Sequence, residues 1–313
     1  MRVLETTMDL QLLHRAASAY YLDDLRQAEI AAKLGVSRPT VSKLLAEARR
    51  IGMVRFEVLD VTTADLDDLA ARLRETLGVE SVRIAPGDQV QREYRGLGEL
   101  LAEELAALGL RRGDALLISS GRTTFAVSGM PMLPPLPGVI IAPTVGGLQE
   151  PDQAYQTNDT ARRIAARTGA ESRSIFAPAL PSASLWSSLQ ADPSFREITD
   201  LWDRARAVIV GVGAPYARRE SLTSVVPREE PSLEAAAGDI CLHFFGDDGE
   251  PMAFPGSDRL VRPSLDQLHA VPTIFALAAG REKARSIRAG ARAQLFTHLI
   301  TDVPTAEAVL AEA

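Results

Sequence analysis

Four short segments rich in glycine and hydroxyl side chains each follow an apolar run of the sequence. They are Ser119–Thr124 (SSGRTT), Thr144–Gln149 (TVGGLQ), Gly211–Gly213 (GVG) and Gly280–Lys283 (GREK). Glycines let backbone N–H groups approach an anion, hydroxyl groups add donors, and a following helix contributes positive potential at its start. A single such segment is usually only a turn, but four of them together predict a site for a small polar or anionic ligand.

Lysine is rare in this chain and gives a further indication of such a site. Only three of the 34 basic residues are lysine, namely Lys33, Lys43 and Lys283. A compact ammonium group at the start of a helix can contact a phosphate where a guanidinium would not fit. Lys283 is therefore a candidate ligand contact, with an exposed helix lysine as the alternative.

The elements that must position these segments alternate between short β-rich runs and helical stretches. This alternation predicts a mostly parallel sheet covered by helices on both faces, and ligands of such sheets bind beyond the carboxyl ends of the strands. We expect strands at Ser81–Ala85, Ala115–Ser119, Val139–Pro143, Ser174–Ala177, Ala207–Gly211, Thr273–Ala278 and Thr297–Ile300, and helices at Glu93–Leu108, Thr157–Thr168 and Glu282–Ala291.

The first fifty residues have a different pattern, that of three short helices. We expect them at Asp9–Tyr21, Arg26–Leu34 and Arg38–Arg50. Gly35 can end the second helix in the left-handed conformation, and Ser37 can cap the third, whose first turn tolerates Pro39.

The spacing of Ala31, Gly35 and Val41 is typical of a DNA-reading helix-turn-helix. Ala31 is a small residue where the two helices of the motif cross, Gly35 is the turn glycine, and Val41 is the apolar residue that packs the recognition helix, Arg38–Arg50, against the first. If Val41 faces the core, Pro39, Lys43 and Arg50 point outward. The groove-entering candidates are Ser37, Arg38, Thr40 and Ser42, and the phosphate candidates are Lys43, Arg49 and Arg50. Pro39 belongs to the same DNA-binding segment and can brace the start of the helix.

Charge is distributed unevenly along the chain. The net charge is −7, yet residues 1–57 carry +2 and the remainder carries −9. Between Lys33 and Arg55 there are six bases and one acid, Glu47. A local basic patch on an acidic protein favours DNA as a partner of the N-terminal segment alone.

These patterns divide the chain into a helix-turn-helix domain at 1–57 and a larger α/β domain at 58–313. Met53–Leu59 alternates like a strand and is either a wing or the first link to the next domain. Thr62–Leu77 predicts an amphipathic helix with Leu66, Leu69, Leu73 and Leu77, a connector or a dimer seam.

Several classes of protein are disfavoured by composition. No apolar run approaches the roughly 20 residues of a membrane span, and Met1–Asp9 lacks a signal-peptide pattern, so we expect a cytoplasmic protein without a membrane partner. The single cysteine, Cys241, excludes an intrachain disulfide and is expected to be a buried small hydrophobe. No Cys or His cluster has metal-ligand spacing, and Tyr216 stands where a dinucleotide fingerprint after Gly211 needs glycine, so we expect neither metal nor cofactor.

The residues resemble the SorC family of bacterial sugar-sensing regulators nearly from end to end. The matching segments are QAEIAAKLGVSRPTVSKLLAEARRIGMV, IAPTVGG, the helix containing Asn158, IFAPAL, ITDLWDRARAVIVGVG, AAGDICLHFFGDDG, AAGREKARSIRAG and LITDVPTAEAVL. The resemblance implies a Rossmann-like large domain similar to sugar-phosphate isomerases and glucosamine-phosphate deaminases, used to bind an effector. It also implies operator DNA as a partner and a homo-oligomer, a dimer or a tetramer built from dimers.

The same resemblance implies which residues contact the effector. By position they are Thr123, Thr124, Gly146, Gly147, Asp239 and Lys283, with Arg218 or Arg219 as a less certain alignment. The glycine-rich segments themselves add Ser120, Gly121, Arg122, Gln149 and Gly213. Arg122 replaces an aromatic residue of many members, and some members have a basic residue near Thr144. We expect a phosphorylated sugar, with an unphosphorylated polyol as the alternative.

Two other functions compete with a metabolite-controlled regulator. One is an isomerase, deaminase or lyase with a DNA-binding head, but no histidine stands in a glycine-rich segment to serve as acid or base. The other is an assembly scaffold without a ligand, which would not need four loops that expose their backbone.

Overall fold

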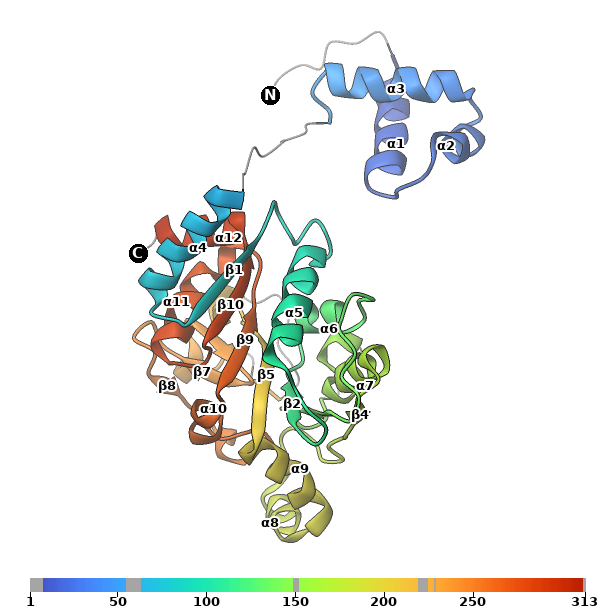
Figure 1. Cartoon of the computed structure of the whole chain (residues 1–313). Helices are drawn as coiled ribbons and strands as arrows, with labels where there is room; N and C mark the ends of the chain where they lie inside the picture. Colours follow the sequence, from blue (N-terminus) through green and yellow to red (C-terminus); the bar gives the residue numbers. More distant parts are fainter. Residues whose placement is uncertain (1–7, 55–62, 149–151, 219–224, 228, 312–313) are drawn as a thin grey trace. The chain divides into compact units, whose positions relative to one another are not determined.

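The computed structural model of the chain describes residues 8–54, 63–148, 152–218, 225–227 and 229–311. The chain forms two compact units, Met1–Asp60 and Val61–Ala313, each with its own hydrophobic core (Figure 1). In the described residues no helix combines the length and the apolar composition that a membrane crossing needs.

The first unit contains the three predicted helices, α1 (Leu10–Tyr21), α2 (Gln27–Leu34) and α3 (Arg38–Arg50). Asp9 caps α1 by accepting from the N–H of Gln11 at 2.8 Å. The apolar faces of the three helices form one small core that includes Leu13, Ile30, Val41 and Leu44. The strand predicted at Met53–Leu59 falls largely outside the described residues, because the description stops at Val54.

The second unit is built on a seven-stranded sheet whose order is β1-β10-β9-β5-β2-β3-β4, with every pairing parallel. The predicted parallel α/β fold is therefore confirmed. The strands are β1 (Ser81–Ala85), β2 (Ala115–Ile118), β3 (Ile140–Pro143), β4 (Glu171–Ser172), β5 (Ala205–Gly211), β9 (Thr273–Leu277) and β10 (His298–Asp302).

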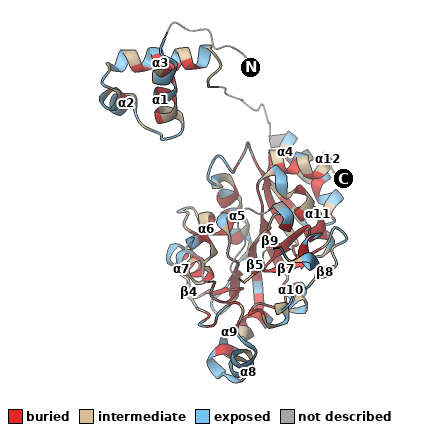
Figure 2. Ribbon diagram, turned by 180° about the vertical axis from the view of Figure 1, so that it is seen from behind, coloured by how far each residue is buried: buried red, intermediate tan, exposed pale blue. Residues whose placement is uncertain are grey.

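Alternating side chains of the central strands supply two separate cores, one on each face of the sheet. Leu117 and Val208 belong to one core, whereas their neighbours Leu116 and Ile209 belong to the other. Figure 2 shows the central strands in the colour of buried residues. Three helices cover the Leu116 face: α5 (Arg95–Leu108), α6 (Arg122–Ser128) and α7 (Thr157–Thr168). Five helices contribute residues to the core on the other face: α4 (Thr63–Leu77), α9 (Pro193–Asp203), α10 (Leu265–Ala270), α11 (Ala284–Arg292) and α12 (Val303–Ala311). Helix α8 (Ala183–Ala191) packs against α9 at one end of the unit (Figure 1).

One predicted strand is wrong. The edge strand β4 is Glu171–Ser172, and Ser174–Ala177 is not part of the sheet. The Asn158 side chain explains this, because its amide nitrogen donates to the carbonyl of Ile175 and its oxygen accepts from the N–H of Ile175, both at 3.0 Å. The backbone of Ile175 is thus hydrogen-bonded to a helix side chain, and no neighbouring strand is needed to satisfy it.

A small antiparallel sheet, β6 (Gly238–Ile240), β7 (His243–Phe245) and β8 (Pro251–Met252), was not predicted. Its first hairpin turns at Cys241 and Leu242, which both have positive φ (51° and 64°). Side chains hold this turn: Asp239 accepts from the N–H of Leu242 at 3.1 Å, and Arg262 donates to the Leu242 carbonyl. Two-residue turns with positive φ normally contain Asn or Gly, so the sequence CL carries no turn signal.

Helix α4 packs on its own unit. Leu73 is fully buried in the core, and Leu66, Leu69 and Leu77 pack against that core. The predicted helix is confirmed, and its leucine stripe packs against the core of the same unit.

Replacing Leu73 by Ala should lower the free energy of unfolding of the large unit by about 2–5 kcal/mol, because it leaves a cavity under α4. Urea denaturation followed by circular dichroism measures this loss. The control is Arg74→Ala, a change at an exposed neighbour on the same helix. Equal effects of the two substitutions would show that α4 is not docked through Leu73.

The stability of the small sheet should depend on pH through His243. Burial lowers the pKa of His243 to about 4, and its Nε2 donates to the Pro263 carbonyl at 2.8 Å. Between pH 6.5 and 4 the unfolded chain binds a proton that the folded chain does not, so the free energy of unfolding falls as the pH falls. The full loss, reached below pH 4, is about 3 kcal/mol.

The comparison variant is His243→Gln, which keeps a donor for the Pro263 carbonyl and has no proton equilibrium in this range. Urea titrations at several pH values should give a shallower fall for the variant than for the natural chain. Parallel curves would contradict the role of His243.

Candidate functional site

The turn between α2 and α3 has the geometry of a helix-turn-helix. Gly35 ends α2 in the left-handed conformation with φ 68°, and Ser37 caps α3 by accepting from the N–H of Thr40 at 3.2 Å. Val41 is fully buried and fixes α3 against the other two helices. The local signals read from the sequence are therefore confirmed.

The opposite face of α3 is open to solvent. Arg38, Pro39, Ser42, Lys43 and Arg49 are exposed, and Thr40 is half-buried. Exposed hydroxyl and basic side chains at the start of such a helix can contact base edges and phosphates.

Arg50 is also exposed, but its guanidinium makes two bonds to the Glu47 carboxylate, at 2.6 and 2.7 Å. Glu47 offsets part of its charge, so a phosphate would have to compete with this ion pair.

The four glycine-rich segments of the large unit follow β2, β3, β5 and β9. These strands are neighbours in the order β9-β5-β2-β3, and their parallel direction brings the four segments to one edge of the sheet. The chain runs outward from β2 to β3 and β4, and then returns to place β5 on the other side of β2. The β2–β5 junction is thus a topological switch point, where open α/β sheets bind ligands.

The segments after β2 and β5 touch across this switch point. The Ser119 hydroxyl accepts from the N–H of Gly211 at 3.1 Å. A Cβ on Gly211 would lie 3.8 Å from the methyl group of Thr124 and 4.0 Å from the Ser120 carbonyl. Both distances are ordinary van der Waals contacts, so a methyl group would fit there. Because Gly211 has none, that space between the two segments stays open.

The glycines of the site do not act in the way expected from the sequence. Their N–H groups already donate within the protein, Gly121 to the Ala154 carbonyl at 2.7 Å and Gly213 to the Asp239 carbonyl at 2.9 Å. Gly146 and Gly147 donate to the carbonyls of Val261 and Ala177, at 2.9 and 2.8 Å. Because these four amides are already paired within the protein, they are not available to an anion without rearrangement.

Gly146 also has a packing role. A Cβ at this position would lie 3.0 Å from the Ala177 carbonyl oxygen and 3.0 Å from the backbone of Ala179. The glycine therefore allows the segment after β3 to pack closely against residues 177–179. Side chains and the first N–H groups of α6, which have no partner within the helix, are candidate donors for a ligand.

The predicted contact side chains differ in exposure. Thr123 and Thr124 are buried, Ser120 and Lys283 are half-buried, and Arg122 is exposed. The Asp239 carboxylate holds the hairpin turn through the N–H of Leu242. Gln149 and Arg219 lie outside the described residues, as does the side chain of Arg218.

Two residues in contact with the segment after β3 or next to its partners, Arg262 and Cys241, were not predicted as part of the site. Burial lowers the pKa of the Arg262 guanidinium to about 10, and Arg262 directly follows Val261, the acceptor of the Gly146 N–H. Burial raises the pKa of the Cys241 thiol to about 12, and its Sγ lies 3.5 Å from the Thr144 hydroxyl. The segment RLVRPS carries no motif that could have identified Arg262, whereas the burial of Cys241 was predicted and is confirmed.

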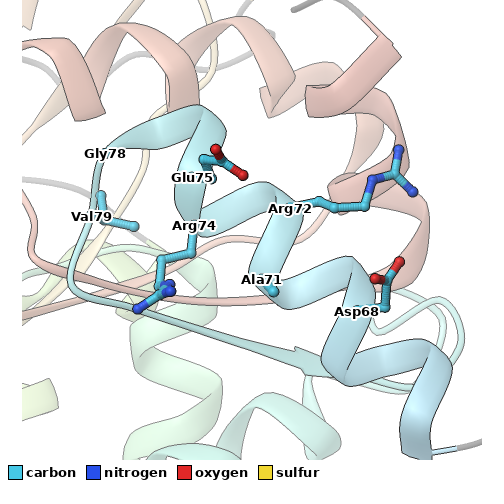
Figure 3. Close-up of a pocket in the computed structure, with 7 residues that line it drawn as sticks. All are labelled: Asp68, Ala71, Arg72, Arg74, Glu75, Gly78 and Val79. Atoms are coloured by element: carbon cyan, nitrogen blue, oxygen red, sulfur yellow. The ribbon is translucent and has the colours of Figure 1, made fainter.

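Two surface hollows lie away from this edge. The larger, of about 720 Å³, is lined by both acidic and basic side chains of α4 and by Gly78 and Val79, which precede β1 (Figure 3). The smaller, of about 310 Å³, includes Ile140, Arg173 and Arg204, near the amino ends of β3 and β5. The candidate ligand site therefore follows from the strand order and not from these hollows.

Comparison with known proteins gives consistent matches over nearly the whole chain. Residues 62–311 match the family described as "Putative sugar-binding domain". The sorbitol operon regulator of Klebsiella pneumoniae is 28% identical over an alignment of 324 positions, which covers 98% of this chain and 100% of the relative. The transcriptional regulator LsrR of Klebsiella pneumoniae subsp. pneumoniae is 31% identical over an alignment of 316 positions, which covers 96% of this chain and 93% of the relative.

A solved structure agrees with these matches. The full-length sorbitol operon regulator SorC from Klebsiella pneumoniae has a TM-score of 0.70 and 26% sequence identity, covering 96% of this chain and 98% of that chain. A family match over most of the chain, a helix-turn-helix before it and relatives named as transcriptional regulators agree with one another. The chain therefore belongs to the SorC family of transcriptional regulators and carries that family's sugar-binding domain.

Proposed function

We propose that this protein is a sequence-specific DNA-binding regulator of a carbohydrate or polyol catabolic operon, controlled by a small sugar-like effector. The observation that carries the proposal is the convergence of four loops at the switch point of a sheet, in a chain that also has an exposed helix-turn-helix. The names of its relatives, among them a sorbitol operon regulator, support this class of effector. The site of action is the cytoplasm, where the operator DNA is.

The DNA partner follows from the surface of α3. Ser37, Arg38, Pro39, Thr40 and Ser42 lie at the end of the helix that would enter the major groove. Lys43, Arg49 and Arg50 lie further along and would contact phosphates. The first unit carries a net positive charge and the rest of the chain a net negative charge, so the first unit, the DNA-binding head, is the part suited to a duplex.

The effector partner follows from the side chains at the strand ends. Ser120 and Thr123 offer hydroxyl groups, and Arg122 and Lys283 offer positive charge. The Thr124 hydroxyl donates to the Gly121 carbonyl at 2.9 Å and would act toward a ligand as an acceptor. This combination suits a phosphorylated sugar, whose phosphate would pair with the two basic side chains. An unphosphorylated polyol is the alternative, and the two basic side chains would then donate hydrogen bonds to its hydroxyl groups. Gly146, Gly147 and Gly213 would shape the site through their lack of a side chain, whereas Gly121, Gln149, Arg218 and Asp239 remain predicted contacts.

Regulation would be a linkage between effector binding and the arrangement of copies of the chain. A twofold pair of heads contacts half-sites about 34 Å apart or a multiple of it. An effector that binds one arrangement more tightly than another shifts the population toward it, and so changes the fit to the operator. We infer that the functional form is a homo-oligomer, a dimer or a tetramer.

An enzyme with the same fold is the competing function, and the histidines do not favour it. His14 is in α1, His243 donates to a backbone carbonyl, and His269 lies 3.1 Å from the carbonyl of Ala293. His298, in β10, contacts the hydroxyl of Thr297.

Incubation of the protein with sugar phosphates should give no product, and measurable turnover would favour an isomerase or deaminase instead.

Base reading by α3 is tested with Arg38→Ala and Ser42→Ala. Each substitution should weaken binding to the operator by roughly 1–3 kcal/mol if the side chain reads a base, and should change binding to random DNA much less. Fluorescence anisotropy with fragments upstream of neighbouring genes measures both affinities. The control is Arg15→Ala, an exposed arginine of α1.

An equal loss on operator and random DNA would remove Arg38 and Ser42 from base reading. If the natural chain prefers no promoter fragment at modest salt, with or without sugar phosphates, the regulator proposal itself is wrong.

Effector binding by Lys283 is tested with Lys283→Met in a thermal-shift titration with sorbitol, sorbitol 6-phosphate and other sugar phosphates. A ligand at 100 times its dissociation constant stabilises the natural chain by about 2.7 kcal/mol. The variant should lose this stabilisation and keep the melting temperature of the free protein. Lys33→Met, at an exposed lysine of the first unit, is the control. An unchanged titration in Lys283→Met would exclude Lys283 from the site.

A further inference from the structure

A buried hydrogen-bond network contacts the segment that carries Lys283 through the N–H of Gly280. Its centre is Asp302, the last residue of β10, with Thr305 in the first turn of α12 and Gln89 in the segment after β1. All three are buried: Asp302 is 1% exposed, Thr305 is 0% exposed and Gln89 is 2% exposed. Such burial of a carboxyl group is costly unless hydrogen bonds compensate for it.

The network is fully connected. The Asp302 carboxyl accepts from the N–H of Gln89 at 2.8 Å, from the N–H of Thr305 at 3.1 Å and from the Thr305 hydroxyl. The Thr305 hydroxyl in turn accepts from the N–H of Gly280 at 2.8 Å. It therefore acts as a relay that donates to Asp302 and accepts from Gly280.

The network joins the carboxyl ends of three neighbouring strands. Gln89 follows β1, Asp302 ends β10 and Gly280 follows β9, and these strands are adjacent in the order β1-β10-β9. The Gln89 side chain extends the connection, because it accepts from the N–H of Gly96 at 2.7 Å and donates to the Pro86 carbonyl at 2.8 Å. The segment after β9 is thus fixed to two other loops of the same edge.

Gly280 is the fixed point from which the turn with Lys283 extends. It has φ 120°, a conformation that favours glycine, and its carbonyl accepts from the N–H of Lys283 at 3.0 Å. A fixed backbone lowers the entropy that a flexible lysine loses when it contacts a ligand. The place of the Lys283 backbone therefore depends on the bond between Gly280 and Thr305.

We propose that Asp302 and Thr305 are positioning residues for Lys283, and that their network presets the turn after β9 for effector binding. This inference rests on the proposed function, because that proposal makes Lys283 an effector contact. Neither residue needs to touch the effector, and their influence passes through the Gly280 N–H.

The alternative is that the network only stabilises the fold and does not position Lys283. A buried threonine outside the network provides a matched control that separates the two roles. Thr301 is also in β10, is 0% exposed, and its hydroxyl has no hydrogen-bond partner in the described part of the chain. Thr301→Val removes a buried hydroxyl outside the network, Thr305→Val removes the relay, and Thr305→Ser keeps it. Thr→Val replaces the hydroxyl with a methyl group of similar size, whereas Thr→Ser keeps the hydroxyl and loses one methyl group.

The first test needs no ligand and uses the three lysines of the chain. Acetylation by limiting acetic anhydride, read by peptide mass spectrometry, gives the rate at Lys283 relative to Lys33 and Lys43 of the same molecule. Thr305→Val should raise this ratio because the turn is released, whereas Thr305→Ser and Thr301→Val should leave it at the natural value. A ratio unchanged in Thr305→Val, or raised equally in Thr301→Val, overturns the proposal.

A measurement on the natural chain covers the case in which Thr305→Val does not fold. The N–H of Gly280 should exchange slowly with deuterium, because it donates to a buried hydroxyl. Exchange as fast as that of an exposed loop amide would overturn the proposal without any variant.

The second test is a double-mutant cycle in which the affinity for sorbitol 6-phosphate is measured. Thr305→Val should weaken binding of this probe roughly tenfold in the natural background, the lower end of the cost of losing an outer-shell partner. In Lys283→Met, whose remaining affinity is measured at higher probe concentrations, Thr305→Val should have no further effect. Equal effects in both backgrounds would mean that Thr305 acts independently of Lys283, which overturns the proposal. If the natural chain does not bind the probe, the proposed effector class is in doubt, whereas the labelling ratio still decides the role of Thr305.

Discussion

A parallel sheet is stable in water only when both of its faces are covered, and this constraint organises the large unit. The central strands place Leu117 and Val208 in one core and Leu116 and Ile209 in the other, so both faces are sealed by helices. Polar chemistry can then occur only at the edges where strands end. Because all seven strands run in the same direction, their carboxyl ends meet at a single edge, and the loops with hydroxyl and basic side chains meet there as well.

The sequence predicted those features that have a local cause. Gly35, Ser37 and Pro39 fix the ends of α2 and α3 by their own conformational preferences, and the buried strands are continuous apolar runs bounded by glycine. The place of the loops at one edge also followed, because it depends only on the direction of the strands. The fold class and the general position of the candidate site could therefore be predicted without coordinates.

The features that were missed depend on contacts between distant residues. Asn158 pairs with Ile175 and so moves the last strand of the sheet to Glu171–Ser172. The turn at Cys241 and Leu242 is held by Asp239 and by Arg262, twenty residues later, and its own residue types do not indicate a turn. The N–H groups of the site glycines find their acceptors in segments that no local pattern connects to them, which is why the sequence did not show that these amides are already paired.

The pairing of β1 with β10 has a consequence for how the chain reaches its native state. Residues 81–85 align with residues 298–302, more than 200 positions later, so the first strand of the large unit stays without a neighbour until the ribosome has made almost the whole protein. Sheets dominated by such distant pairings fold slowly and expose unpaired strand edges meanwhile, which favours aggregation. The three-helix head needs only contacts within its first sixty residues and can form while the rest is still being synthesised. Truncation near the C-terminus therefore removes the partner of the first strand and leaves the head intact.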